Sequence, residues 1–127
     1  MLEFPEEKDP LTERIIGCAI EVHRALGPGL LESAYRRALC MELAHKQIRF
    51  ERERRIPLQY RGRPLGAYRV DLIVESRVVV EVKSVLRWEP VFEAQILTYL
   101  RITGARVGLL MNFNKGVLKA GIKRFVL

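Results

Sequence analysis

Three charged side chains stand within an apolar stretch between residues 68 and 83, which reads YRVDLIVESRVVVEVK. Asp71, Glu81 and Lys83 interrupt runs of valine, leucine and isoleucine that are typical of strands covered on both faces. Burying a charge costs several kcal/mol unless the charge is paired or binds a metal. These side chains are therefore candidates for a site in which two carboxylates and an ammonium group act together.

A hairpin would bring the three groups together. If Glu-Ser-Arg forms its loop, Val74 faces Val78, and the same register places Asp71 opposite Glu81. Directly opposed residues lie on one face of a sheet with Cβ atoms about 4.5–5.5 Å apart, and Lys83, two residues further on, shares that face. A slip of one residue would separate the carboxylates, and the loop contains no Gly or Asn to favour one register.

Helical spacing of apolar residues predicts two helices before the hairpin. The first begins at Asp9 and Pro10, an N-cap acceptor followed by proline, and ends before the Gly-Pro-Gly of residues 27–29. The second covers residues 30–46.

The remaining pattern predicts a sheet that carries one further helix. The elements expected are a strand over residues 48–60 with a bulge or break near 52–55, a turn at 61–64, the hairpin at 68–83, a helix from Pro90 to Gly104, a strand at 107–111, and a last strand or extended segment at 117–126. The strand–helix–strand crossover requires parallel strands, whereas the tight turns require antiparallel ones. We therefore expect an α/β fold in three layers, with a mixed sheet between helices, and a single domain over residues 1–127 with 1–8 as a loose tail.

Charge is unevenly distributed along the 127 residues, whose net charge is +7. Residues 1–45 hold five Lys and Arg against eight Asp and Glu, a net of −3, and residues 46–127 have a net of +10. A basic half of this kind favours a polyanionic partner. No apolar run approaches the roughly 18–20 residues that span a membrane, no signal-peptide core is present, and the two cysteines form no CxxC pair, so we expect a cytoplasmic protein.

The spacing Asp71-x9-Glu81-x-Lys83 on adjacent strands resembles the PD-(D/E)XK nuclease superfamily. The expected order α-β-β-β-α-β is the core of that superfamily. Gln95 and Tyr99 in the following helix match its QxxxY element, and residues 29–35, GLLESAY, match the signature of its GxxExxY family. The resemblance covers residues 11–127. One departure is that valine stands before Asp71, where the name motif has proline.

This resemblance implies hydrolysis of phosphodiester bonds in nucleic acid, with DNA expected before RNA. Asp71 and Glu81 would share Mg²⁺, for which Mn²⁺ could substitute, since carboxylate oxygens suit a hard cation. The carbonyl of Val82 and the carboxylate of Glu32 would be further ligands.

Other roles follow from the same resemblance. Lys83 would orient the attacking water or stabilise the scissile phosphate, and Gln95 would position a phosphate or the water. The hydroxyls of Tyr35 and Tyr99 would support the site from outside the metal ligands. Glu32 and Gln95, from two helices, would approach the same face of the sheet.

Simpler interpretations remain open for each feature. Asp71 and Lys83 could form a plain buried ion pair, and Glu32 could pair with Arg36 on its own helix. The arginines between residues 52 and 63 could be a solvated strand face or could contact phosphates. The whole protein could be a non-catalytic nucleic-acid-binding module on the nuclease fold, or an interaction subunit or homodimer paired through an edge strand.

Overall fold

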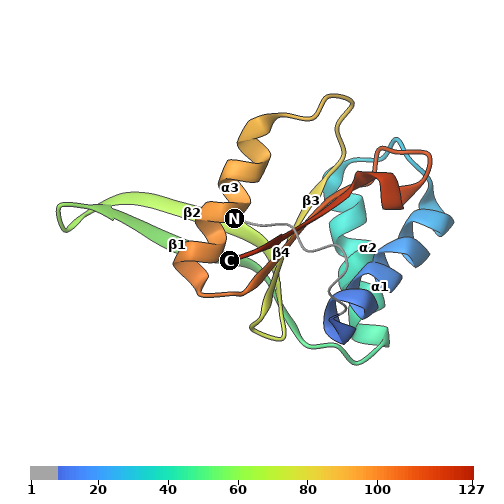
Figure 1. Ribbon diagram of the computed structural model, residues 1–127, viewed down its shortest axis with the longest axis horizontal. Coiled ribbons are helices and arrows are strands. Elements are labelled where there is room, and N and C mark those ends of the chain that lie inside the picture. The colour runs from blue at the N-terminus through green and yellow to red at the C-terminus, as the bar shows by residue number, and fades with distance from the viewer. Residues whose placement is uncertain (1–8) are drawn as a thin grey trace.

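A five-stranded mixed sheet, in the order β1-β2-β3-β4-β5, organises the protein, and a computed structural model describes it for residues 9–127 (Figure 1). The tail expected at residues 1–8 lies outside the described part. The strands are β1 (Phe50–Tyr60), β2 (Arg63–Val74), β3 (Val78–Lys83), β4 (Val107–Asn112) and β5 (Ile122–Val126). The pairing of β3 with β4 is parallel and the other three pairings are antiparallel. The mixed sheet is thus confirmed, with its single parallel pair at the crossover.

Helices cover both faces of the sheet. Helices α1 (Pro10–Leu26) and α2 (Glu32–His45) lie on one face and α3 (Pro90–Thr103) lies on the other, with a short 3-10 helix, η1 (Leu118–Gly121), before β5 (Figure 1). The predicted N-cap is present, because Asp9 Oδ1 accepts from the amide of Leu11 at 3.1 Å. No helix within residues 9–127 is both long enough and apolar enough to cross a membrane.

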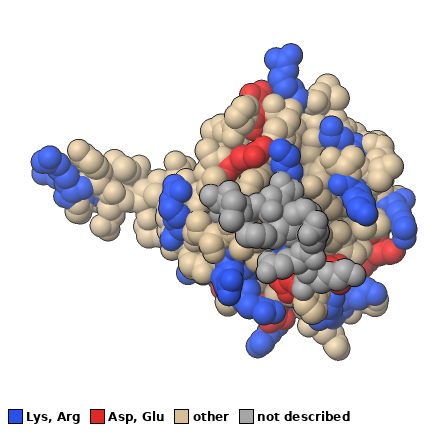
Figure 2. Space-filling model, in the orientation of Figure 1, with Lys and Arg blue, Asp and Glu red and all other residues tan. Residues whose placement is uncertain are grey.

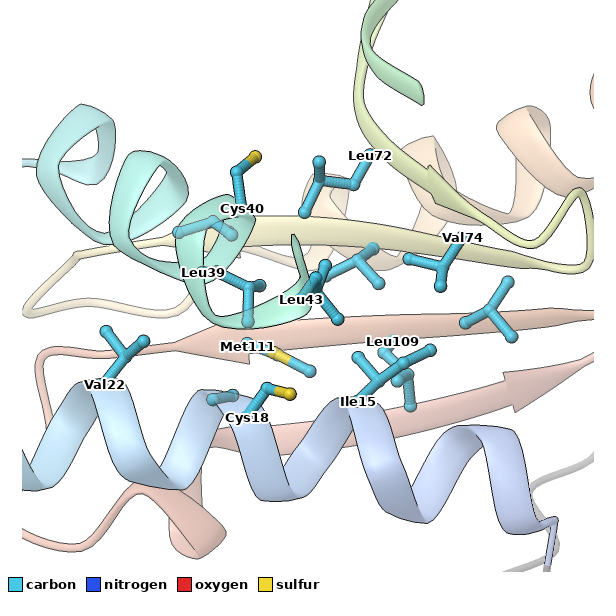
Figure 3. Close-up of a cluster of buried hydrophobic side chains, with 14 of the residues drawn as sticks. Ile15, Cys18, Val22, Leu39, Cys40, Leu43, Leu72, Val74, Leu109 and Met111 are labelled. Carbon is cyan, nitrogen blue, oxygen red and sulfur yellow. The ribbon is translucent and has the colours of Figure 1, made fainter. Parts of the chain in front are cut away.

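The two faces form two separate cores. Side chains of α1 and α2, such as Ile15, Leu39 and Leu43, meet the alternate residues of β3 and β4 on the first face (Figure 3). On the second face, Ile96 and Leu100 of α3 pack on the other set of strand residues. Burial of both faces explains why the strands read as continuous apolar runs.

The predicted hairpin register is confirmed over three pairs, Val74–Val78, Ile73–Val79 and Leu72–Val80. Glu75 and Ser76 in the loop have positive φ values of 51° and 56°, a conformation unusual for residues other than glycine. The amide of Arg49 donates to Glu75 Oε2 at 3.1 Å, so contacts outside the hairpin hold this turn. This explains how the register forms without a glycine in the loop.

The predicted turn at residues 61–64 and the start of the hairpin at residue 68 are both wrong in extent. Strand β2 begins at Arg63, and all of its first five residues except Leu65, which lies at a shift in register, pair with the end of β1. The break expected near residues 52–55 is present: Glu53 has a φ of 52°, and the pairing of β1 with β2 passes from Arg52 to Arg54. The segment expected to be extended at residues 117–126 begins instead as η1, and only β5 is a strand.

Candidate active site

Asp71 and Glu81 meet where the ladder between β2 and β3 ends. Beyond the last pair, Leu72–Val80, each carboxylate binds the backbone of the opposite strand. The amide of Asp71 donates to Glu81 Oε2 at 2.8 Å, and the amide of Val82 donates to Asp71 Oδ2 at 2.8 Å. Side chains thus replace the next backbone hydrogen bonds, and the two carboxylates are brought together as the predicted register required.

Both carboxylates are withdrawn from water. The residue Glu81 is 4% exposed and the side chain of Asp71 is 15% exposed. Burial, and then the charge of Asp71, raise the pKa of Glu81 to about 8. Burial also raises the pKa of Asp71, while the amide of Val82 acts to lower that pKa. Two anionic groups in this position oppose each other's ionisation, and a cation between them would remove the conflict.

Lys83 is the last residue of β3 and lies two residues beyond Glu81. Its Nζ lies 4.6 Å from the centre of the Phe92 ring, at the start of α3. Its charge acts to lower the pKa of both Asp71 and Glu81. Among the described residues, however, Lys83 makes no salt bridge within 4.0 Å, so the plain Asp71–Lys83 ion pair is not formed.

Glu32 reaches the site from the first turn of α2, and its charge acts to raise the pKa of Asp71 and Glu81. Its Oε2 accepts from the amide of Ser84 at 3.4 Å, just past β3. The expectation that Glu32 and Gln95 approach one face of the sheet is wrong, because α2 and α3 cover opposite faces (Figure 1). Glu32 instead approaches the carboxylates at the end of β3, beyond which no strand separates the two faces of the sheet.

The alternative pairing of Glu32 with Arg36 is not found in the described structure. Arg36 NH1 instead lies 3.5 Å from Asp71 Oδ1, and its NH2 lies 3.7 Å from Glu53 Oε1. This arginine was not singled out from the sequence as a partner of Asp71, because the contact joins residues 35 positions apart. Arg36 therefore supplies positive charge to one side of the carboxylate pair.

Gln95 and Tyr99 lie one turn apart on α3, where Tyr99 is buried in the core against the sheet and Gln95 is half-buried. Burial and the charges of Glu81 and Asp71 raise the pKa of Tyr99 to about 12, and a hydrogen bond with Gln95 acts in the opposite direction. Gln95 also lines a shallow surface hollow with Tyr68, Val91 and Thr98. The structure thus brings Gln95 and Tyr99 to the α3 side of the carboxylates.

Tyr35 serves the loop that leads into α2. Its hydroxyl donates to the carbonyl of Gly27 and accepts from the amide of Leu30 at 3.1 Å. Its ring, fully buried, stacks on Phe113 with ring centres 4.6 Å apart. The contacts of this hydroxyl are with the loop, so its effect on the site is transmitted through the placement of Glu32.

Asn112, at the end of β4, is a supporting residue that the sequence reasoning missed. It is 2% exposed, and its side chain binds both the amide and the carbonyl of Val85, at 3.1 and 3.0 Å, and the amide of Asn114 at 3.1 Å. It therefore ties the loop after Lys83 to the sheet. A polar residue closing a fully apolar strand, in the sequence Val-Gly-Leu-Leu-Met-Asn, was the available signal.

The donor set at the strand ends fits a hard divalent cation. Mg²⁺ is typically held through one or two carboxylates and keeps several waters, which matches a pair of carboxylates beside a strand carbonyl such as that of Val82. Within residues 9–127 no group of three or more acidic, histidine or cysteine side chains is arranged to hold a metal ion by itself. A site built on Asp71 and Glu81 would therefore leave ligand positions for water or substrate.

Comparison with known proteins agrees with this arrangement. A family model described as the PD-(D/E)XK nuclease superfamily matches residues 9–125. No curated protein and no solved structure gives a significant match. The match spans both helical layers and the whole sheet, including the strand ends that carry Asp71, Glu81 and Lys83. The chain belongs to the PD-(D/E)XK nuclease superfamily.

Proposed function

We propose that this protein is a Mg²⁺-dependent nuclease that hydrolyses phosphodiester bonds in nucleic acid. The observation that carries the proposal is the buried pair of Asp71 and Glu81, each bound to the backbone of the other's strand. Superfamily members typically use divalent metals. Burial raises the pKa values of both carboxyls, and a cation bound between them would favour their ionised forms.

In the proposed site Asp71, Glu81 and the carbonyl of Val82 hold the cation, and Glu32 adds a ligand directly or through water. A bound Mg²⁺ lowers the pKa of its water and offsets negative charge on the phosphoryl group. Mn²⁺, which also prefers oxygen ligands, is a suitable replacement.

The remaining residues act on substrate and water. Lys83, fixed over Phe92, donates to the attacking water or to a non-bridging oxygen of the scissile phosphate. Gln95 orients the water or a neighbouring phosphate, and Tyr99 holds Gln95 through their hydrogen bond. Tyr35 acts through the loop before Glu32.

We further assign the protein to the GxxExxY family. The three fixed residues of the signature have different roles in this assignment. Gly29 has a φ of 102°, which favours glycine, Tyr35 anchors the same loop, and Glu32 begins the helix that the loop positions. The two free cysteines, Cys18 and Cys40, are buried thiols, which suits the reducing cytoplasm that we propose as its location.

A cleavage assay with matched variants tests the proposed activity. The protein is incubated with single- and double-stranded DNA and RNA in Mg²⁺ or Mn²⁺. We expect Asp71→Asn, Glu81→Gln and Lys83→Gln each to lower the cleavage rate at least about a hundredfold, as loss of a charged group in such a site does. Titration calorimetry should show Mg²⁺ binding that is weakened by Asp71→Asn and Glu81→Gln but retained by Lys83→Gln.

Glu21→Gln is the matched control, because Glu21 is an exposed carboxylate of α1 whose ion pair is with Arg24. Its cleavage rate and Mg²⁺ affinity should equal those of the wild type. Absence of metal-dependent cleavage on all four substrates, or cleavage that survives the three site substitutions, would show that the protein is not a nuclease acting through this site. Salt-dependent nucleic-acid binding without turnover would favour the binding module instead.

A further inference from the structure

The ends of β1 and β2 form an arm that extends away from the rest of the protein. We define the arm as residues 54–69. Ile56, at its base, is the one buried residue of the arm, although the strands remain paired as far as Tyr60 and Arg63 (Figure 1). The space-filling view shows the same projection, with basic side chains at its tip (Figure 2).

The arm is basic and contains no acidic residue. Residues 54–69 include five arginines and no Lys, Asp or Glu. Two of these arginines form ion pairs toward the base of the arm, Arg54 with Glu51 at 3.9 Å and Arg69 with Glu53 at 3.6 Å. The other three, Arg55, Arg61 and Arg63, make no ion pair in the described part of the chain. Arg61 and Arg63 lie at the tip of the arm and Arg55 at its base, so the arm carries uncompensated positive charge at both ends.

The arm also exposes apolar surface that no part of the described structure covers. Tyr60 is 64% exposed and Leu65 is 67% exposed. A two-stranded hairpin in water is marginally stable by itself, and long exposed strands are a risk for unwanted pairing. Retaining such an arm is understandable if a partner binds it, and its charge indicates a polyanion.

We infer that the arm binds in the major groove of duplex DNA beside the proposed active site. The inference takes the nucleic-acid substrate of the proposed function as given. The major groove of B-DNA, about 12 Å wide, admits a two-stranded β-ribbon, and arginine is the side chain that binds phosphates and guanine edges through paired hydrogen bonds. The deep, narrow major groove of A-form RNA does not admit such a ribbon, so the arm selects DNA.

The arm is connected directly to the carboxylate site. Strand β2 continues from Arg69 through Val70 to Asp71, and the ring of Tyr68 packs edge-on against Tyr99 at 5.7 Å between ring centres. Arg63 lies eight residues from Asp71, which at about 3.3 Å per residue is a reach of roughly 26 Å. This length corresponds to about 7–8 base pairs of duplex at 3.4 Å each, so the arm would contact DNA on one side of the scissile phosphate.

Two variants test the arm separately from its fold. The triple variant Arg55→Gln, Arg61→Gln, Arg63→Gln removes the unpaired charges and keeps the hairpin. The second variant joins Ile56 to Tyr68, which are directly paired, through an Asn-Gly turn and so shortens the arm. The matched control is Arg24→Gln, Arg77→Gln, Arg106→Gln, which removes three exposed arginines outside the arm.

Binding to a labelled 30-base-pair DNA duplex and to the RNA duplex of the same sequence is measured by fluorescence anisotropy in EDTA, over a range of salt concentrations. We expect the arm variants to bind the DNA duplex at least about tenfold more weakly than the wild type. For the triple variant the slope of log affinity against log salt should fall by up to about 3, because each phosphate contact contributes about 0.9. The control should bind DNA within about twofold of the wild type, and RNA binding should be weaker and independent of the arm.

Unchanged DNA binding by both arm variants would overturn the inference, and so would equal, arm-dependent binding of the RNA duplex. A shift from dimer to monomer in the shortened variant, seen by light scattering with DNA affinity unchanged, would identify the arm as a contact between copies. Because binding is measured without metal, it is independent of cleavage. A wild type that binds DNA through the arm but cuts nothing would refute the proposed function and leave this inference standing.

Discussion

Asp71 and Glu81 illustrate how two buried acids can be held together before any cation binds. Each carboxylate accepts an amide hydrogen from the opposite strand, which offsets part of the cost of removing it from water. The offset is incomplete, since the pKa of each carboxyl remains above its ordinary value. The pair is therefore a source of instability in the metal-free protein at neutral pH.

The pKa of Glu81 predicts how the stability of the metal-free protein varies with pH. Below about pH 4.5, the ordinary pKa of a glutamate, Glu81 is protonated in both the folded and the unfolded protein. The stability that the protonated Glu81 contributes to the folded state is then fully present. As pH rises toward about 8 the unfolded chain loses this proton first, so the free energy of unfolding falls, by on the order of a few kcal/mol. Denaturant unfolding in EDTA between pH 5 and pH 9 measures the decrease.

Glu81→Gln should remove most of this pH dependence and should be more stable than the wild type at pH 8 without metal. Added Mg²⁺ should stabilise the wild type at pH 8 and leave Glu81→Gln nearly unchanged, because only the ionised pair gains a ligand. Glu21→Gln should retain the wild-type profile. A Glu81→Gln profile that falls as steeply as the wild type would contradict the assignment of the slope to this residue.

At the scale of elements, the sheet is interrupted where the chemistry lies. Strand β1 kinks at Glu53, β2 separates from β3 at Asp71, and the loop after β3 is fastened by Asn112. On the other side of Asn112, η1 brings Gly121 against the backbone of the same residue. The polar strand end is thus supported by elements from both sides.

Gly121→Ala should strongly destabilise this support. A Cβ at residue 121 would lie 2.4 Å from the carbonyl oxygen of Asn112, a backbone atom that cannot yield as a flexible side chain would. We expect the free energy of unfolding, measured with denaturant, to fall by about 1–3 kcal/mol, which is the range typical of overpacking.

Gly116→Ala is the control, since a Cβ at Gly116 meets nothing within 4 Å. It should change the free energy of unfolding by no more than about 0.5 kcal/mol. Equal stability of the two alanine variants would mean that the approach of Gly121 to Asn112 is not a close contact in solution.

At the scale of the whole molecule, one sheet joins two cores. Neighbouring residues of β3 alternate between the core under α1 and α2 and the core under α3. Neither core can be lost without exposing strands that the other core needs. This arrangement supports the proposal that the described residues form a single cooperative domain.

Unfolding should therefore be a single transition that mutations in either core lower together. Leu39→Ala on the α2 side and Ile96→Ala on the α3 side both remove fully buried side chains, and each should cost about 2–5 kcal/mol. Calorimetry and circular dichroism should show one coincident transition for both variants. Two resolved transitions, with each variant shifting a different one, would contradict the single domain.

The sequence alone determined the apolar strands and the three interrupting charges, and it predicted the register of their hairpin, which the contact between Arg49 and Glu75 helps to hold. Those features depend on alternation and short loops, which are local. The superfamily motif and the order of elements followed from the same local information. The extent of β2 was missed because residues 63–66 have turn composition. Of these, Arg63, Pro64 and Gly66 become strand only by pairing with β1.

Only the tertiary structure decided which groups surround the carboxylates. Arg36 contacts Asp71 across 35 residues, Glu32 comes from the helix layer opposite Gln95, and Asn112 secures a loop 27 residues earlier in the chain. Such contacts depend on how separate elements pack, and no periodicity in a single segment encodes them. The same is true of the arm. Its exposure depends on the fact that no other element of the described structure covers the paired strands beyond Ile56 and Tyr68.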